Sequence, residues 1–134
     1  MRRVSVALFL ILAGCSSSEP ADSESTKCGE RFCLTSAANL VSKREIADFN
    51  VYQVDWNGHR YGIYEGDFPT LHHGDSTRVR LPIDPAAELM LAERMGIVLA
   101  RVGPDWPRFL EITGPCSSQA NCEIADFAET LSRP

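Results

Sequence analysis

Residues 49–65, FNVYQVDWNGHRYGIYE, carry the clearest secondary-structure pattern of the chain. Phe49–Trp56 and Arg60–Glu65 are rich in the β-branched and aromatic residues that strands favour. Asn57-Gly58 lies between them, and this pair favours a type I′ turn because both positions tolerate a positive φ. The sequence therefore predicts a β-hairpin. The two-residue turn sets the strand register as Trp56 with His59, Asp55 with Arg60, Val54 with Tyr61, Tyr52 with Ile63, and Val51 with Tyr64.

The two faces of this hairpin differ in chemistry, because neighbouring side chains of a strand point to opposite faces. The face expected to pack on the core consists of Tyr52, Val54, Trp56, Tyr61 and Ile63. The opposite face consists of Val51, Gln53, Asp55, Arg60 and Tyr64. Asp55 opposite Arg60 predicts a cross-strand ion pair, worth from a few tenths to about 1 kcal/mol.

Further strands are expected on both sides of this hairpin. Phe32–Leu34 is a candidate first strand. Arg78–Ile83 is a candidate edge strand, because Pro82 lacks the N–H that a central strand needs. Ile97–Val102 and Arg108–Thr113 flank the turn cluster GPDWP and predict a second hairpin.

Two helices are also expected. Asp84-Pro85 is typical of a helix start, with Asp as the N-cap and Pro in the first turn, and Gly96 is typical of a helix end. The residues between them predict a central helix. Glu123–Leu131 places its apolar residues on one side and predicts a C-terminal helix. The expected fold class is α+β, a small antiparallel sheet built from two hairpins with one central and one C-terminal helix and two disulfides.

Length and composition indicate one globular domain and exclude some classes of partner. The chain has 134 residues, of which 44% are hydrophobic and 23% charged, which is ordinary for one globular domain. Its 13 basic and 18 acidic residues give a formal net charge of −5. This acidic balance argues against a nucleic-acid partner, because a phosphate backbone attracts basic surfaces.

The N-terminus has the pattern of an export signal. Arg2 and Arg3 precede the apolar run Val4–Ala13, whose ten residues are about half of what a membrane-spanning helix needs. The run ends in Leu12-Ala13-Gly14-Cys15, which resembles the lipobox of bacterial lipoproteins. The resemblance implies a diacylglyceryl group on the Cys15 thiol, cleavage before Cys15, and acylation of the new amino group. The alternative is an ordinary Cys15 thiol behind a conventionally cleaved signal.

The lipoprotein resemblance also implies a location and a division of the chain. Ser16 follows the cysteine where Asp typically retains a Gram-negative lipoprotein in the inner membrane, so the expected location is the outer membrane, facing the periplasm. Residues 1–14 are predicted to be the signal peptide, 15–27 a disordered tether, and 28–134 a disulfide-bonded periplasmic domain. The mature chain has 11 basic and 18 acidic residues, a net charge of −7. Acyl chains, and not surface charge, are therefore expected to hold it to the membrane.

Four further cysteines belong to the predicted domain, namely Cys28, Cys33, Cys116 and Cys122. Disulfides are the expected state of an exported domain, and four cysteines permit three connectivities. Local pairing is favoured because Gly29 and the polar run Ser117–Asn121 suit tight turns. A four-cysteine zinc site or a redox dithiol is the alternative, although neither pair has the usual CxxC spacing.

Two stretches are candidates for chemistry. His72, His73 and Asp75 have metal-ligand side chains, and the competing interpretation is a polar loop. Tyr61–Pro69 mixes aromatic residues, glycines and two acids, so it is a candidate binding face for a peptide or a glycan, against the alternative of hairpin core followed by a turn. The chain has no glycine-rich phosphate loop and no G-x-S-x-G or S-x-x-K nucleophile motif.

The function expected from these features is that of a lipid-anchored envelope lipoprotein with a non-enzymatic binding or accessory domain. Its expected partners are the membrane, through the acyl chains on Cys15, and an envelope protein, a cell-wall polymer or an exported hydrolase. No cofactor is expected. The first alternative is a metal-dependent envelope enzyme that uses the loop with His72, His73 and Asp75. The second alternative is a structural subunit of an envelope assembly.

Overall fold

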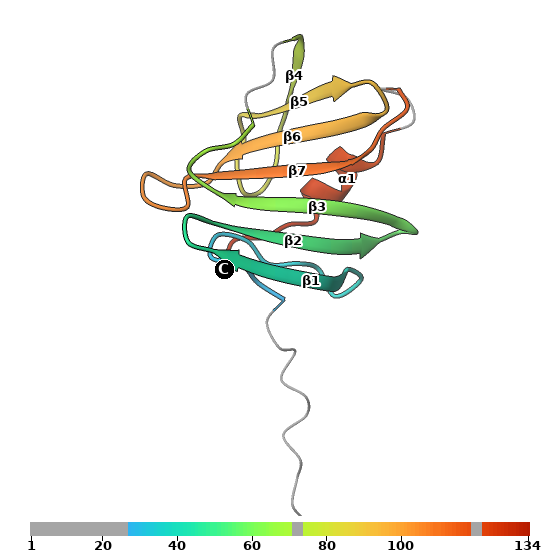
Figure 1. Ribbon diagram of the computed structural model, residues 1–134. Coiled ribbons are helices and arrows are strands. Elements are labelled where there is room, and N and C mark those ends of the chain that lie inside the picture. Colours follow the sequence, from blue (N-terminus) through green and yellow to red (C-terminus); the bar gives the residue numbers. More distant parts are fainter. Residues whose placement is uncertain (1–26, 71–73, 119–121) are drawn as a thin grey trace, which may run out of the picture.

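A single antiparallel sheet of seven strands forms the body of the protein (Figure 1). The computed structural model describes residues 27–70, 74–118 and 122–134. The elements are β1 (Asn39–Ile46), β2 (Phe49–Trp56), β3 (His59–Gly66), β4 (Ser76–Val79), β5 (Ala87–Ala92), β6 (Met95–Arg101), β7 (Phe109–Pro115) and α1 (Ile124–Glu129). The strand order in the sheet is β1-β2-β3-β7-β6-β5-β4, so the chain crosses from β3 to the far edge and returns strand by strand.

The β2–β3 hairpin confirms the predicted register. Asn57 and Gly58 have φ values of 50° and 80°, as a type I′ turn requires. All of the predicted pairs, from Trp56 with His59 to Val51 with Tyr64, are present. Arg60 donates from Nε and Nη2 to the two carboxylate oxygens of Asp55 at 2.8 and 3.0 Å, which is the expected ion pair on the exposed side.

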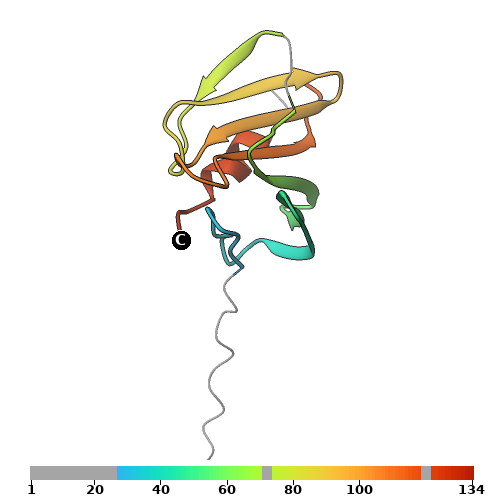
Figure 2. The same cartoon turned by 60° about the vertical axis from the view of Figure 1, so that its left-hand side comes forward.

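One face of the sheet is covered by α1 and by segments from both ends of the domain, as the two views show (Figures 1 and 2). The predicted core side of the hairpin lies in this covered layer, where Tyr52, Val54, Tyr61 and Ile63 are buried and Trp56 is partly buried. The other chain segments contribute Phe32, Leu81, Ile83, Leu110, Ile112, Ile124, Phe127 and Leu131. We call this side the closed layer and the opposite side of the sheet the open face.

Two glycines let the closed layer pack directly on the backbone. Gly96 and Gly114 are paired across β6 and β7. A Cβ atom at Gly114 would lie 2.3 Å from Cδ1 of Tyr61, and one at Gly96 would lie 2.9 Å from Cγ2 of Ile124. The Tyr61 ring therefore lies flat against β7 and stacks on Phe127 of α1, with 4.4 Å between the ring centroids.

The central helix predicted from Asp84 to Gly96 is wrong, and with it the α+β class. These residues instead form β5 and the start of β6, joined by a turn at Glu93, which has a φ of 58°. Asp84 does bond to a nearby backbone N–H, as an N-cap would, but it accepts from Ala86 at 2.9 Å and from Arg101 of β6 at 2.8 Å. It therefore fixes a turn against β6.

The physical reason for this error lies in the apolar run Leu89-Met90-Leu91. A short continuous apolar run fits a buried strand as well as a helix. In the structure Leu89 packs against the core, while Met90 is buried on the open face beside its partner Ile97. β6 needs a second neighbour to pair its backbone, and this pairing outweighs a weak helix propensity.

The remaining predicted elements are confirmed in part. The second hairpin is present as β6 and β7, and the C-terminal helix is present as α1. The predicted strand Arg78–Ile83 is at the sheet edge, but β4 spans Ser76–Val79, and Leu81 and Ile83 leave the sheet to join the core. Phe32–Leu34 forms no named strand, since only isolated bridges join Cys33 to Cys28 and to Ser132.

Both disulfides are present and both are local. Cys28 is bonded to Cys33, and Cys116 is bonded to Cys122. The first closes a loop that covers the core at Phe32, whose ring meets Tyr52 edge-on at 5.0 Å. Each disulfide therefore closes a short loop, one before β1 and one between β7 and α1.

Candidate functional site

The proposed metal ligands are only partly within the described chain. His72 and His73 lie outside the described residues, and Asp75 is exposed just before β4. Over residues 27–70, 74–118 and 122–134, no group of three or more His, Cys, Asp or Glu side chains is arranged to hold a metal ion. The four domain cysteines are paired in disulfides and so offer no thiolate to zinc. Cys15, the predicted lipidation site, also lies outside the described residues.

Three loops meet at one end of the sheet, at the left in Figure 1, and leave a cleft between them. They are the β1–β2 turn, the start of the β3–β4 connection, and the β6–β7 loop. The cleft has a volume of about 270 Å³ and is lined by Ala47, Asp48, Asp67, Phe68 and Trp106. We call it the aromatic cleft, because 77% of Phe68 and 44% of Trp106 are exposed.

Trp106 is held in place from two sides. Its indole Nε1 donates to the backbone oxygen of Asp48 at 3.0 Å, which joins the β6–β7 loop to the β1–β2 turn. Arg31, from the loop closed by the first disulfide, donates from Nη2 to the backbone oxygens of Asp105 and Trp106 at 3.1 and 3.4 Å. Because the only polar atom of the indole is already paired, the exposed part of Trp106 is apolar.

The β3–β4 connection is fixed at three successive points beside the cleft. Asp67 accepts hydrogen bonds on Oδ1 from the backbone N–H of Arg108 at 3.0 Å. The backbone N–H of Phe68 donates to the hydroxyl of Tyr64 at 3.0 Å. Two residues on, the backbone N–H of Thr70 donates to the buried carboxylate of Glu111 at 2.7 Å. Phe68 therefore projects from an anchored backbone, although its own ring is mostly in water.

The charged residues that line the aromatic cleft, Asp48 and Asp67, are both acidic. Asp67 forms an ion pair with Arg108, whose Nε lies 3.3 Å from Oδ1. The guanidinium of Arg31 lies behind the carbonyls of Asp105 and Trp106. Within the described part of the chain, the Asp48 side chain has no hydrogen-bond or ion-pair partner. The cleft thus combines apolar rings with unpaired carboxylate oxygens, and Arg108 neutralises one of its two acidic residues.

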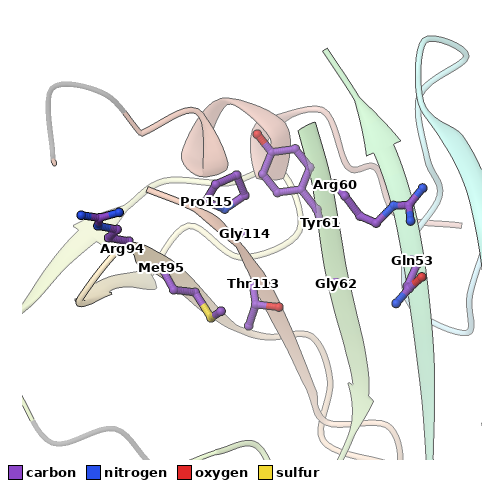
Figure 3. A pocket seen from close by; sticks show the side chains of 9 residues that line it. All are labelled: Gln53, Arg60, Tyr61, Gly62, Arg94, Met95, Thr113, Gly114 and Pro115. Carbon is purple, nitrogen blue, oxygen red and sulfur yellow. The ribbon is translucent and has the colours of Figure 1, made fainter. Parts of the chain in front are cut away.

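A second hollow lies where β2, β3 and β7 meet the β5–β6 turn (Figure 3). It has a volume of about 430 Å³, and Gly62 leaves it room because a Cβ there would meet the hydroxyl of Thr113 at 2.8 Å. Arg60 borders it but is already paired with Asp55. Arg94 and Met95 border it at the turn, and no exposed aromatic ring lines it.

The Tyr61 hydroxyl is the one buried side-chain polar atom in the described residues without a hydrogen-bond partner. Figure 3 shows its ring beside α1, in agreement with the stacking on Phe127. Burial raises the pKa of this hydroxyl, and the nearby carboxylates of Glu123 and Asp126 raise it further. The hydroxyl is therefore a neutral group inside the closed layer.

A buried carboxylate ties the first disulfide loop to the sheet. Glu65 is fully buried and accepts from the backbone N–H of Arg31 at 2.8 Å, from the hydroxyl of Tyr52 at 2.8 Å and from the amide of Asn50 at 3.3 Å. Burial and the bond to Glu65 strongly raise the pKa of Tyr52. Since Glu65 has no access to solvent, its role is to hold Arg31, and through it the back of the Trp106 loop.

The structure places only part of the predicted binding stretch at the cleft. Asp67 and Phe68, at the end of the predicted binding stretch Tyr61–Pro69, line the aromatic cleft, whereas Tyr61 and Glu65 belong to the core. Trp106 was assigned only to a turn cluster. Its position between two prolines was the available signal, because a tryptophan in a tight turn has little chance of reaching the core.

No protein-family model matches the chain, and neither a curated protein nor a solved structure matches it. Within the described ranges, no helix has the length and apolar character needed to cross a bilayer.

Proposed function

We propose that this protein is a lipid-anchored envelope lipoprotein whose domain binds a partner through the aromatic cleft, without catalysing a reaction. The observation that carries the proposal is the exposure of Phe68 and Trp106 on two loops that are each fixed by hydrogen bonds. Exposed aromatic rings on a fixed frame are a common feature of binding sites, because they bury much apolar area and lose little conformational entropy on binding.

The attachment rests on the sequence. The lipobox ends at Cys15, and two or more acyl chains hold a protein durably to a bilayer. Twelve residues, Ser16 to Lys27, separate this cysteine from the first disulfide loop and reach about 40 Å when fully extended. By the same resemblance, Ser16 favours the outer membrane and its periplasmic face. The two disulfides support export to an oxidising compartment.

The anchor is tested by the intact mass of the protein extracted from membranes, before and after reduction. The expected mass is that of a chain starting at Cys15 with added acyl groups, and reduction adds the four hydrogens that two disulfides take up. A Cys15→Ser variant should lose the acyl mass and leave the membrane fraction. A chain that keeps Met1, or one whose thiols are all free without reduction, contradicts the proposal.

The binding role is tested by a photo-crosslinking amino acid at position 68 in intact envelopes. The matched control is position 91, because Leu91 is a comparably apolar residue that is 41% exposed but lies on β5, outside the cleft. Adducts to envelope protein or cell-wall polymer from position 68, and not from position 91, are expected. Equal adducts from both positions favour a structural subunit packed into an assembly, and no adduct from position 68 contradicts binding through the cleft.

A further inference from the structure

The aromatic cleft has features that narrow the chemistry of its ligand. Its volume of about 270 Å³ lies just below the range of pockets that enclose a whole drug-sized molecule, so it can seat one ring or one side chain. The walls are the apolar faces of Phe68 and Trp106, and the acceptors are the carboxylates of Asp48 and Asp67. A matching ligand has an apolar face and hydroxyl or N–H donors around its rim.

Charge separates the two ligand classes that fit this description. A basic side chain binds aromatic rings through cation–π attraction and gains most from an excess of carboxylate. Both charged residues that line the cleft are acidic, but Asp67 is already neutralised by Arg108, which leaves Asp48 as the one unpaired carboxylate of the lining. A cation in the cleft therefore gains from one free carboxylate only, whereas the hydroxyls of an uncharged ligand can use the unpaired oxygens of both residues.

From the apolar rings and the unpaired carboxylate oxygens of the lining, and resting on the proposed function, we infer that the aromatic cleft binds an uncharged sugar ring presented by a polysaccharide of the envelope. A pyranose ring has C–H groups on its faces, which pack on the faces of aromatic rings. Its hydroxyls lie around the rim and donate to carboxylate oxygens. Asp48 supplies unpaired oxygens, and Asp67 has Oδ2 to offer because both contacts to Arg108 fall on Oδ1.

The frame of the cleft fits this ligand as well. The indole N–H of Trp106 is bound to Asp48, so the indole cannot turn its polar edge toward the ligand without breaking a bond. Phe68 makes the opposite contribution, since its ring has no such restraint and can adjust to the sugar face. One fixed ring and one adjustable ring suit a polymer that presents successive, similar rings.

The test measures saturation transfer by NMR from the folded domain, residues 28–134 with both disulfides formed, to two probes: a four-ring glucose oligomer and a four-ring N-acetylglucosamine oligomer, both uncharged. Circular dichroism first verifies that this domain folds without the tether; otherwise the full chain in detergent is used. Transfer to at least one oligomer is expected. The Phe68→Ala variant should bind that oligomer at least about tenfold more weakly than the parent domain, since the Phe68 ring forms one wall of the site. The Leu91→Ala variant is the matched control and should retain the affinity.

Ionic strength and competing probes decide between ligand classes. Sugar binding should change less than about twofold between low and high salt, because screening acts on charges and not on ring stacking. No transfer to either oligomer overturns the inference, as does transfer that Phe68→Ala leaves intact. Tighter binding of a tetra-arginine peptide or of phosphatidylcholine vesicles, abolished by Phe68→Ala, also overturns it. In those cases crosslinks from position 68 in envelopes still support the proposed function, so the two proposals fail separately.

Discussion

Tyr61 and Phe68 belong to one short segment, yet Tyr61 is fully buried while 77% of Phe68 is exposed. Tyr61 packs between β7 and α1, where Gly114 leaves room for its ring. Phe68 extends from a backbone that is bound to Tyr64 and flanked by Asp67 and Thr70, both also hydrogen-bonded. In the closed layer, therefore, aromatic rings stabilise the fold by packing in the core. At the cleft, hydrogen bonds fix the backbone so that the Phe68 ring stays outside the core.

The largest expected effect is at Glu65, the buried carboxylate that joins the two regions. Replacing it in Glu65→Leu leaves the Tyr52 hydroxyl, the Asn50 amide and the Arg31 N–H without their acceptor. Each unsatisfied buried donor costs about 1–3 kcal/mol, so we expect a loss of about 4 kcal/mol in the free energy of unfolding. Denaturant unfolding measures it. The Glu65→Gln control keeps one acceptor oxygen and should lose less than half as much; equal losses contradict the hydrogen-bond explanation.

The next largest effect is expected at Gly114, which tests the packing of the closed layer. In Gly114→Ala the new methyl group would lie 2.3 Å from the Tyr61 ring, so the ring or the strand must move. Overpacking of this kind costs about 3 kcal/mol. The neighbouring Thr113→Val substitution, on the open face, should change stability by less than about 0.5 kcal/mol in the same denaturant measurement. A Gly114→Ala protein as stable as the parent contradicts the close contact.

The sequence predicted the hairpin well and the central helix badly, for one physical reason. Asn57-Gly58 is a local signal, because the turn geometry follows from the two residues themselves. Whether Ala87–Ala92 forms a helix or a strand depends on a non-local contact. The segment is a strand because it pairs with β6, and no residue within the segment signals this pairing. Of the aromatic cleft, Asp67 and Phe68 fell within a predicted binding stretch. Trp106 and Asp48 come from distant loops, and only the folded sheet brings them beside Phe68.

A gain in stability is expected from Tyr61→Phe, which tests whether the buried Tyr61 hydroxyl has a hydrogen-bond partner. The Tyr61 hydroxyl is buried and unpaired among the described residues, so removing it relieves a desolvation cost of about 1 kcal/mol. The matched control is Tyr52→Phe, which removes a hydroxyl that donates to Glu65 and should lower stability by about 1 kcal/mol. Thermal unfolding of both variants measures the difference in sign. A Tyr61→Phe protein that is less stable than the parent indicates a partner for this hydroxyl.

A small pH effect is expected at the exposed ion pair between Asp55 and Arg60. The hydrogen bonds from Arg60 lower the pKa of the Asp55 carboxyl in the folded protein. A carboxyl whose folded pKa is depressed stabilises the fold above its unfolded pKa, and the contribution disappears as the pH falls through the folded value. Asp55→Asn should remove this part of the acid sensitivity between neutral pH and about pH 3. Unfolding midpoints across that range compare the two proteins, and identical pH profiles contradict a role for the pair.

The smallest effect on stability is expected at Phe68, although it should have the largest effect on binding. Because 77% of this residue is exposed and its backbone bond to Tyr64 does not need the ring, Phe68→Ala should change the free energy of unfolding by less than about 0.5 kcal/mol. Denaturant unfolding beside the Leu91→Ala control measures this. A loss above 1.5 kcal/mol would show that the ring packs on the fold. An unchanged stability together with lost binding would show that the Phe68 ring acts in contact with a partner and not in folding, unlike the rings of the closed layer.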